Sequence, residues 1–328
     1  MKTNEIIKNR SEIVFLYDIK DANPNGDPLD ENKPRIDEET GINIVTDVRL
    51  KRTIRDYLMK FKGEEIFVRE ITDDKGKIQD AKLRANDFLK DVKNLGNKRF
   101  NEQKEIIKNE IIGNCIDVRL FGATIPLDLS IKEGNKTKSV TGSITLTGPI
   151  QFRMGRSLHR VEIKHIKGTG AFAARAGATQ KTFREEDILP YSLICFYGIV
   201  NENAAKHTNL TGNDVNLLLE GMWNGTKNLI TRSKAGQMPR LLLKVNYKES
   251  DYHIGDLDKL IKIKDIDKIE QEKLRDITDV TLDANELIKT LNKNKGKIES
   301  IELKIDERLN IDFSSLDKGI QKKDLQFK

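Results

Sequence analysis

Residues Ser11–Ile19, with the sequence SEIVFLYDI, decide the fold of this 328-residue chain. The stretch is short, rich in β-branched and aromatic side chains, and followed by the turn-forming residues Asp21–Pro28, so it predicts a buried strand. Thr46 then offers an N-cap and Asp47 an acid for a first helical turn, which predicts a helix to about Lys60. The chain is therefore expected to begin with a strand and a helix.

Three further stretches have the pattern of strands. Ser139–Met154 alternates apolar and polar residues, whereas Leu189–Val200 and Met238–Tyr247 are short and strongly apolar. Between the last two, Thr211 and Asp214 resemble a capping box that starts a second helix. The resulting order β, α, β, β, α, β predicts an α+β fold of the split βαβ, ferredoxin-like (RRM-like) kind.

Three segments lie outside this order. An insertion at residues 63–114 is predicted to be a surface subdomain with two helices, at residues 81–95 and 101–112. Residues 155–183 are basic, rich in Gly and Ala and almost without periodicity, which is typical of a functional excursion or of disorder. The tail from residue 251 has the periodicity of helices and then of a strand, at residues 257–274, 284–291 and 301–305.

The composition excludes several classes of protein. Hydrophobic residues make up 37% and charged residues 34% of the chain, which is typical of a folded protein with a thick charged surface. No apolar run approaches the roughly 18 residues of a membrane helix, and the first ten residues do not resemble a signal peptide. Cys115 and Cys195 are isolated, and histidines are few. We therefore predict a cytoplasmic protein without membrane contact, disulfide, metal site or cofactor.

The positive charge is concentrated in three stretches. Residues 149–184 contain eight Lys or Arg and one acid, residues 226–248 contain six and none, and residues 46–62 contain six and two. The rest of the chain is net acidic although the whole carries +6. Such segregation favours a polyanion as the partner, provided that the three stretches converge in space.

The densest polar cluster is suited to a sugar-phosphate backbone. It consists of Arg153, Arg156, Ser157, His159 and Arg160, which can grip successive phosphates if they line one surface. The sequence lacks the aromatic signature of base-stacking RNA modules. We therefore predict binding that is largely indifferent to base sequence.

Two other chemistries compete with simple polyanion binding. DANPNGD at Asp21–Asp27 approximates a calcium loop, but Asn32 stands where a bidentate Glu is needed, so an Asx-type turn is favoured. His159 is a candidate general base acting on the 2′-hydroxyl of RNA, which makes a ribonuclease the main enzymatic alternative.

Six strings in this sequence resemble, in order and spacing, the backbone subunit of type I CRISPR interference complexes (Cascade), nearest the I-B and I-C branches. They are DANPNGDP at Asp21, KPRID at Lys33, TGINIVTDVRLKRTIRDYL at Thr40, DVRLFGA at Asp117, TGPIQFRMGRSLH at Thr147 and LPYSLICFYG at Leu189. The resemblance covers about Ser11–Tyr247 and is weak in the insertion and the tail.

The resemblance implies a hand-shaped protein. Residues 1–62 would form the first strand and helix of a ferredoxin-like palm, 63–114 helical fingers, 115–159 further palm strands and 160–188 a protruding thumb. Residues 189–250 would complete the palm, and 251–328 would be an extension of unknown role. Several copies would assemble with other Cascade subunits on one CRISPR guide RNA and present it for pairing with target DNA.

The resemblance also implies a set of guide-RNA contacts without catalysis. The motif residues are Asn25, Arg35, Lys51, Arg52, Arg55, Arg119, Arg153 and Arg156. Together with Ser157, His159, Arg160 and Lys234 they form the predicted RNA-binding set. Thumb residues expected to touch nucleic acid or a neighbouring copy are Lys164, Lys167, Phe172 and Arg175. Related subunits that cut RNA use an aspartate near the thumb, and Asp128 is the nearest analogue by position, so it joins His159 in the ribonuclease alternative.

Overall fold

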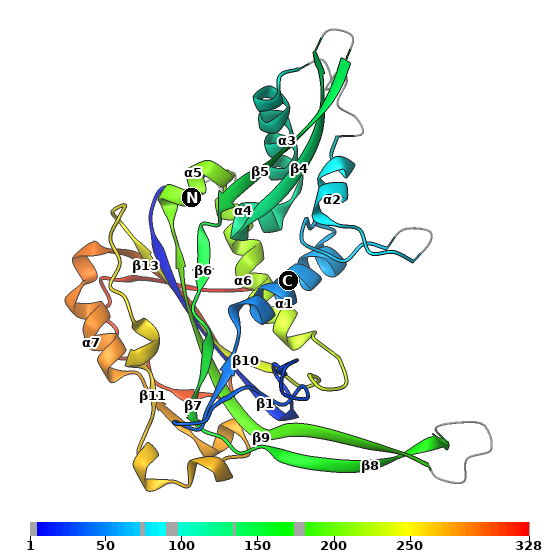
Figure 1. The fold of residues 1–328 in the computed structure, drawn as a ribbon. Coiled ribbons are helices and arrows are strands. Elements are labelled where there is room, and N and C mark those ends of the chain that lie inside the picture. The colour runs from blue at the N-terminus through cyan, green and yellow to red at the C-terminus, as the bar shows by residue number, and fades with distance from the viewer. Residues whose placement is uncertain (1–4, 73–75, 90–97, 134–135, 174–180, 328) are drawn as a thin grey trace. The chain divides into compact units, whose positions relative to one another are not determined.

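Strand β1 (Ser11–Ala22) lies inside a large sheet (Figure 1). The strands of this sheet follow one another in the order β15 (Gln321–Asp324), β13 (Ile298–Ile305), β10 (Met238–Tyr247), β1, β9 (Lys181–Val200), β7 (Gly155–Arg160), β3 (Ile42–Val45) and β2 (Ile36–Asp37). The structure is a computed structural model that describes residues 5–72, 76–89, 98–133, 136–173 and 181–327. The chain divides into two units. The larger unit comprises Arg10–Ile54, Phe152–Ile199 and Glu220–Lys328, and the smaller unit comprises Met1–Asn9, Arg55–Gln151 and Val200–Leu219.

The central strands of the larger unit have the ferredoxin-like order. β1 lies between β10 (Met238–Tyr247) and β9 (Lys181–Val200), and β7 (Gly155–Arg160) lies on the far side of β9. Along the chain, helix α1 (Asp47–Lys62) falls between β1 and β7, and α6 (Gly212–Lys227) between β9 and β10. The predicted α+β, ferredoxin-like fold is therefore confirmed, with β7 as the second strand of the order.

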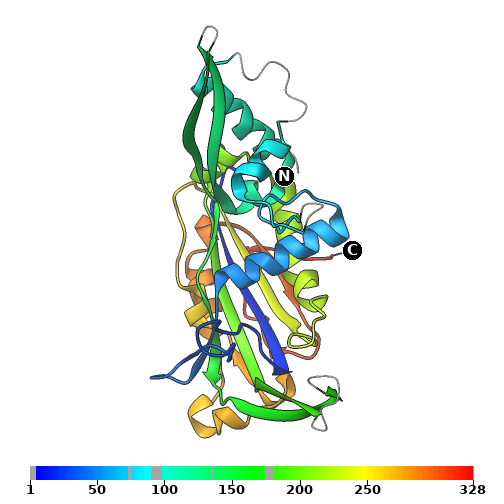
Figure 2. The ribbon, with the colours of Figure 1, turned by 45° about the vertical axis from the view of Figure 1, so that its right-hand side comes forward.

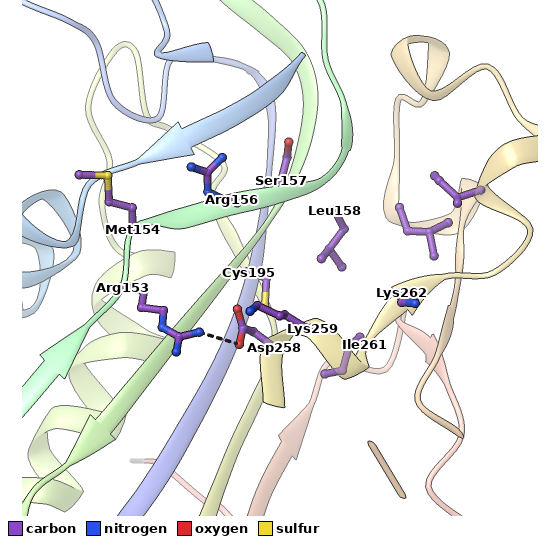
Figure 3. A pocket seen from close by; sticks show the side chains of 12 residues that line it. Arg153, Met154, Arg156, Ser157, Leu158, Cys195, Asp258, Lys259, Ile261 and Lys262 are labelled. Atoms are coloured by element: carbon purple, nitrogen blue, oxygen red, sulfur yellow. Dashed lines mark ion pairs between the residues drawn. The ribbon is translucent and has the colours of Figure 1, made fainter. Parts of the chain in front are cut away.

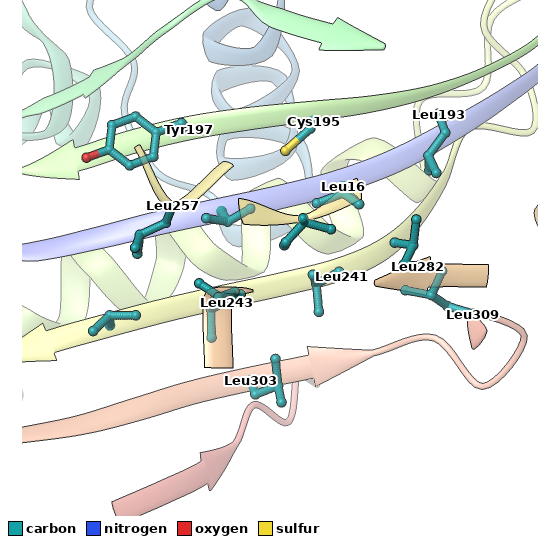
Figure 4. Packing of buried hydrophobic residues seen from close by; sticks show 14 of the residues in the cluster. Leu16, Leu193, Cys195, Tyr197, Leu241, Leu243, Leu257, Leu282, Leu303 and Leu309 are labelled. Atoms are coloured by element: carbon teal, nitrogen blue, oxygen red, sulfur yellow. The ribbon is translucent and has the colours of Figure 1, made fainter. Parts of the chain in front are cut away.

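The tail is part of the core of the larger unit. β13 (Ile298–Ile305) pairs with β10, and β15 (Gln321–Asp324) pairs with β13, so both extend the sheet. Figure 4 shows Leu16, Leu193 and Leu241 of the sheet packed against Leu257 and Leu282 of the tail. Because β1 is buried on both faces, residues after 250 cover one of them, a role that the net acidic composition did not suggest.

The larger unit contains further elements, most of them short. They are β2 (Ile36–Asp37), β3 (Ile42–Val45), β8 (Lys164–Ala173), β11 (Lys262–Ile263), β12 (Thr281–Asp283), α7 (Asn285–Lys293) and β14 (Asn310–Ile311). Residues 257–274, where helical periodicity was expected, form 3₁₀ turns and β11 in place of an α-helix.

The segment expected as a thumb contains a long hairpin. β8 pairs antiparallel with the first half of β9, from Lys164 opposite Ile188 to Ala173 opposite Lys181. Both views show the hairpin extending away from the rest of the sheet of the larger unit (Figures 1 and 2). The weak periodicity of residues 155–183 concealed these strands because their many Gly and Ala residues carry little hydrophobic signal.

The smaller unit is built on a second sheet. β4 (Gly122–Glu133) and β5 (Lys136–Thr147) pair along twelve residues, and helices α2 (Ala81–Asp87), α3 (Phe100–Asn114) and α4 (Ile116–Phe121) contribute to its apolar core. α5 (Glu202–Thr208) also belongs to this unit, and the chain passes from the smaller to the larger unit within β6 (Ile150–Phe152). The assignment of residues 139–154 to one palm strand is wrong, because a period of two identifies a strand but not its partner. No helix among the described residues is long and apolar enough to cross a membrane.

Candidate nucleic-acid interface

The start of helix α1 lies beside the start of strand β7. Strands β3 and β7 pair antiparallel with Val45 opposite Gly155, and Thr46 follows directly as the predicted N-cap. The Thr46 hydroxyl accepts a hydrogen bond from the amide of Arg49 at 3.3 Å, which confirms the cap. Two of the three basic stretches therefore meet at this point, which we call the α1–β7 junction.

Asn25, a partly buried residue of the loop after β1, holds the start of α1. Its Oδ1 accepts hydrogen bonds from the Thr46 amide at 2.9 Å and from the Thr46 hydroxyl at 2.8 Å. The expected RNA contact of Asn25 is thus placed in a structural role, because the side-chain oxygen already holds the N-cap.

Strand β7 divides its residues between two faces. Arg156 and Arg160 are exposed, whereas Ser157 and His159 are buried. The alternation follows from the period of two in a strand, which puts residues 156, 158 and 160 on one side. Sequence proximity therefore overstated the cluster, and only the arginines can meet a partner directly.

The side chains of Ser157 and His159 form hydrogen bonds within the protein. The Ser157 hydroxyl donates to the His159 carbonyl at 2.6 Å and accepts from the Asn43 amide at 2.9 Å. His159 is 2% exposed, and its Nε2 lies 3.2 Å from the Leu193 amide, which donates to it. The expectation that these two side chains touch RNA, or that His159 is a general base, is corrected by this burial.

His159 makes stability depend on pH. Burial lowers the pKa of its imidazole below the ordinary value of 6.5, against smaller upward effects from nearby hydrogen bonds and Glu272. The unfolded chain therefore binds a proton below about pH 6.5 that the folded chain does not, so stability decreases as the pH falls through that range.

We expect His159→Gln to flatten this pH dependence. Wild type loses at most about 1.4 kcal/mol of unfolding free energy per pH unit through this residue, and the variant lacks that loss. Urea unfolding at pH 7.5, 6.5 and 5.5 checks it, with His253→Gln, an exposed histidine, as the control. Parallel decreases in wild type and His159→Gln would contradict the assignment.

Three arginines of the junction have exposed heads and acidic neighbours. Arg153 pairs with Asp256, Arg156 with Asp37 at 3.2 Å, and Arg160 with Glu272 at 2.7 Å. Each arginine side chain is at least half exposed. Exposed pairs of this kind contribute little, about 0–1 kcal/mol, so a stronger anion can displace the carboxylate.

A cavity of about 660 Å³ is lined by Arg153 and Arg156 on one side and by residues of the tail on the other (Figure 3). Figure 3 shows Arg153 directed toward Asp258, with which it forms a second, longer ion pair of 3.8 Å. The wall also contains Lys259 and Lys262, which the sequence analysis missed. They lie in a net acidic segment, so charge counting along the chain gave no signal for them.

Helix α1 and the loop before β10 form a second basic group. Lys51 pairs with Asp47 at 2.9 Å, and Arg52 is exposed. Lys234 is half-buried, and its pKa is lowered first by burial and then by the positive charge of Arg49. Two neighbouring cations in a partly desolvated place favour an anion. Arg49 was missed because it was counted only as part of a basic stretch.

Other predicted contacts are used inside the protein. In the smaller unit, Arg55 binds Asp117 at 2.9 Å, and Arg119 binds both carboxylate oxygens of Asp214 at 2.9 and 3.1 Å. Their expected RNA contacts are therefore not supported, because the guanidinium groups are mostly buried and already paired. Asp214 also completes the predicted capping box with Thr211.

Two basic residues of β10, Arg240 and Lys244, are buried. Arg240 bridges Asp18 at 3.0 Å and Asp306 at 2.7 Å, and Lys244 pairs with Glu302 at 3.4 Å. The three basic stretches were expected to converge in one groove, and this expectation is wrong for most of residues 226–248. Of the predicted contacts in that stretch, Lys234 lies near α1, beside Arg49.

The loop after β1 is a turn without calcium-loop geometry. Asp27 accepts from Arg35 at 2.8 Å and from the Leu29 amide at 3.0 Å, while Asn25 binds Thr46. These side chains point to separate partners, so the calcium alternative is not supported. Arg35, a predicted RNA contact, is partly exposed beside Asp27.

The hairpin residues are placed in part. Lys164 and Lys167 are exposed on β8, and Lys167 pairs with Glu185 at 3.0 Å. Arg175 lies outside the described residues, and so does the side chain of Phe172. Asp128, the second residue of the ribonuclease alternative, is on β4 of the smaller unit and accepts a hydrogen bond from Ser139.

Comparisons with known proteins agree with this fold. The family model described as CRISPR-associated protein Cas7 matches residues 9–285. A protein of Haloferax volcanii named CRISPR-associated protein Cas7 is 35% identical over 316 residues, covering 93% of this chain and 89% of that protein. Two solved structures, titled CRISPR RNA-guided surveillance complex, pre-nicking, and CRISPR RNA-guided surveillance complex, share the fold at 12% identity. Their TM-scores are 0.56 and 0.52, and they cover 97% of this chain and 96% and 95% of their own chains. The family match and the curated relative together show that this chain belongs to the CRISPR-associated Cas7 family.

Proposed function

We propose that this protein is a non-catalytic RNA-binding scaffold of a type I Cascade complex. Copies of it assemble along one CRISPR guide RNA, next to other Cascade subunits, and leave the bases of the guide exposed for pairing with target DNA. Family membership supports this proposal. In this assignment the large sheet is the palm, the smaller unit the fingers and the β8–β9 hairpin the thumb.

The exposed arginines of the α1–β7 junction carry the proposal. Their guanidinium groups bind phosphate bidentately, while the carboxylates that now hold Arg153 and Arg160 are solvent-exposed and weakly competitive. Contacts of this kind read the backbone and not the bases. A protein that presents a guide must bind it in this way, because base pairing reads the sequence.

Binding to RNA of defined length tests the proposal. We expect two unrelated RNAs of equal length to bind equally, and the number of copies per RNA, measured by native mass spectrometry, to rise in steps with RNA length. The RNA is expected to stay intact with and without Mg²⁺. Binding that depends strongly on base sequence, or cleavage that disappears in His159→Gln or Asp128→Asn, would favour the ribonuclease alternative.

Removing the acidic neighbours should strengthen RNA binding. Asp256→Asn with Glu272→Gln removes the shorter of the two ion pairs of Arg153 and the ion pair of Arg160. Because each exposed pair is worth at most about 1 kcal/mol, affinity is expected to rise up to about fivefold per pair. Asn also tolerates the left-handed backbone of residue 256. Fluorescence anisotropy at 0.1 M salt measures the effect, with Asp267→Asn as the matched surface control. An unchanged or reduced affinity would show that these arginines do not meet RNA.

A further inference from the structure

A second cavity, of about 500 Å³, opens in the larger unit at the base of the β8–β9 hairpin. Its wall combines the loop after β1, the lower part of the hairpin and the loop before β10. Five carboxylate residues line it, against one histidine and one arginine: Asp21, Glu31, Glu185, Glu186 and Asp187. The cavity is therefore acidic although the chain as a whole is basic.

Asn23 adds an unused acceptor to this wall. The residue is 4% exposed, its amide nitrogen Nδ2 donates to the Asn32 carbonyl at 2.7 Å, and its backbone N–H donates to the Ser233 carbonyl at 2.9 Å. Its Oδ1 accepts no hydrogen bond from any described residue. A buried acceptor without a donor costs about 1–3 kcal/mol, so a hydrogen-bond donor is missing at this point.

The carboxylates differ in how they are used. Glu185 and Asp187 are bound within the hairpin, by Lys167 at 3.0 Å and by His165 at 3.0 Å. Glu186 pairs with Arg232, which lines the same cavity, at 3.5 Å. In the described part of the chain, no ion pair within 4 Å joins Asp21 or Glu31 to a basic side chain. The available acceptors therefore come from one loop, namely Asp21, Asn23 and Glu31.

These acceptors fit a side-chain cation better than a metal ion. A metal ion needs several ligands within about 2.5 Å of one point, and no group of three or more His, Cys, Asp or Glu in the described residues is arranged to hold one. An ammonium group has three donors and a guanidinium group five, on a stem long enough to enter a cavity of this size. Both groups lack acceptors, which suits a wall made of oxygens.

We propose that this cavity receives a lysine or arginine side chain of a second copy of this chain, bound by Asn23 Oδ1 and the carboxylates of Asp21 and Glu31. The inference rests on the proposed function, in which copies lie next to one another on RNA. Charge complementarity supports this occupant, because a chain with 58 Lys and Arg residues offers the cation that its own acidic cavity lacks. The contact would couple neighbouring copies without touching the RNA.

The test separates contact between copies from binding of RNA. Asp21→Asn with Glu31→Gln, and Asn23→Ala, are compared with Glu38→Gln with Asp267→Asn, two exposed acids outside the cavity. On an RNA long enough for one copy, all variants are expected to bind like wild type. On an RNA that holds several copies, the cavity variants are expected to lose cooperativity by about tenfold, and the control to retain it. Unchanged thermal unfolding shows that the variants fold.

Zero-length carbodiimide cross-linking of the RNA-bound protein gives a second readout. We expect an amide bond between Asp21 or Glu31 of one copy and a lysine of another, found by mass spectrometry of mixed light and heavy protein. Carbodiimide does not join a carboxylate to an arginine, so an arginine in the cavity gives no cross-link. In that case the loss of cooperativity in the cavity variants decides the test. Undiminished cooperativity in both cavity variants, or saturation of the cavity by Mg²⁺ or spermidine alone in calorimetry, overturns the inference. Failure of wild type to bind any RNA refutes the proposed function instead.

Discussion

Replacing Arg153, Arg156 and Arg160 together with Ala is expected to weaken RNA binding by about a hundredfold at 0.1 M salt. Each guanidinium–phosphate contact is a charge-assisted hydrogen bond. The phosphate must first displace the carboxylate that pairs with the arginine, which leaves a net gain of about 1 kcal/mol per arginine. Three such losses give about 3 kcal/mol, or a little over two powers of ten in affinity. The loss should be the same for unrelated RNA sequences, because phosphates carry no sequence information.

The salt dependence provides an independent check of this variant. Each phosphate contact to a single strand contributes about −0.7 to the slope of log K against log salt concentration. Removal of three contacts should therefore flatten the slope by about 2. Arg308→Ala is the matched control, because Arg308 is also half exposed and paired with an acid, Asp306. A loss of affinity with an unchanged slope would mean that these arginines support the fold and do not bind phosphate.

Glu12→Ala is expected to cost the larger unit at least about 3 kcal/mol of unfolding free energy. Glu12 is fully buried on β1, and its carboxylate accepts hydrogen bonds from the hydroxyls of Tyr197 and Tyr247 and from the amides of Ile254 and Gly255, both at 2.9 Å. Removal of the carboxylate leaves the two buried hydroxyls and the Gly255 amide without this acceptor, at about 1–3 kcal/mol each. The Ile254 amide keeps a hydrogen bond of 3.3 Å to the Tyr247 hydroxyl. Burial raises the pKa of both phenols most, and the hydrogen bond to Glu12 together with its charge raises it further, so neither phenol titrates near neutral pH.

Denaturant unfolding and limited proteolysis measure the effect of Glu12→Ala. Because Ile254 and Gly255 begin the tail, we expect faster cleavage near residues 251–256 as well as a lower midpoint. Tyr197→Phe removes only one donor and should cost about 1 kcal/mol, and the exposed Glu307→Ala should change little. If Glu12→Ala were as stable as Glu307→Ala, the tail would not be held by this carboxylate.

Local sequence signals predicted the frame of the fold well. The apolar runs at β1, β9 and β10, the N-cap at Thr46 and the capping box at Thr211 and Asp214 each depend on residues close in the chain. Such signals identify elements and their order, and the order was enough for the ferredoxin-like arrangement. They did not show that β5 pairs with β4 in a separate sheet, because the alternating pattern of a strand does not identify the strand with which it pairs.

The candidate site was predicted only in part, and the reason is the direction of side chains. Arg153, Arg156 and Arg160 are exposed as expected. Arg119 lies in a family motif and Arg240 in a basic stretch, but both are mostly buried and form ion pairs, with Asp214 and Asp306. A count of charges along the chain does not show which basic side chains form ion pairs with acids from distant parts of the sequence. The two anionic neighbours of Arg153 and Arg160 come from a tail more than a hundred residues away in the chain.

The sequence by itself determined β1, α1, α6 and β10 with their order, the family, and the segregation of positive charge along the chain, since periodicity, caps and motifs are local properties. The tertiary structure alone decided which of those charges face solvent, that His159 and Ser157 are buried, and that the tail completes the core of the larger unit. The physical reason is that a charge is expensive to bury without a partner, and the partner can come from anywhere in the chain. Only the folded arrangement shows which cations already have one.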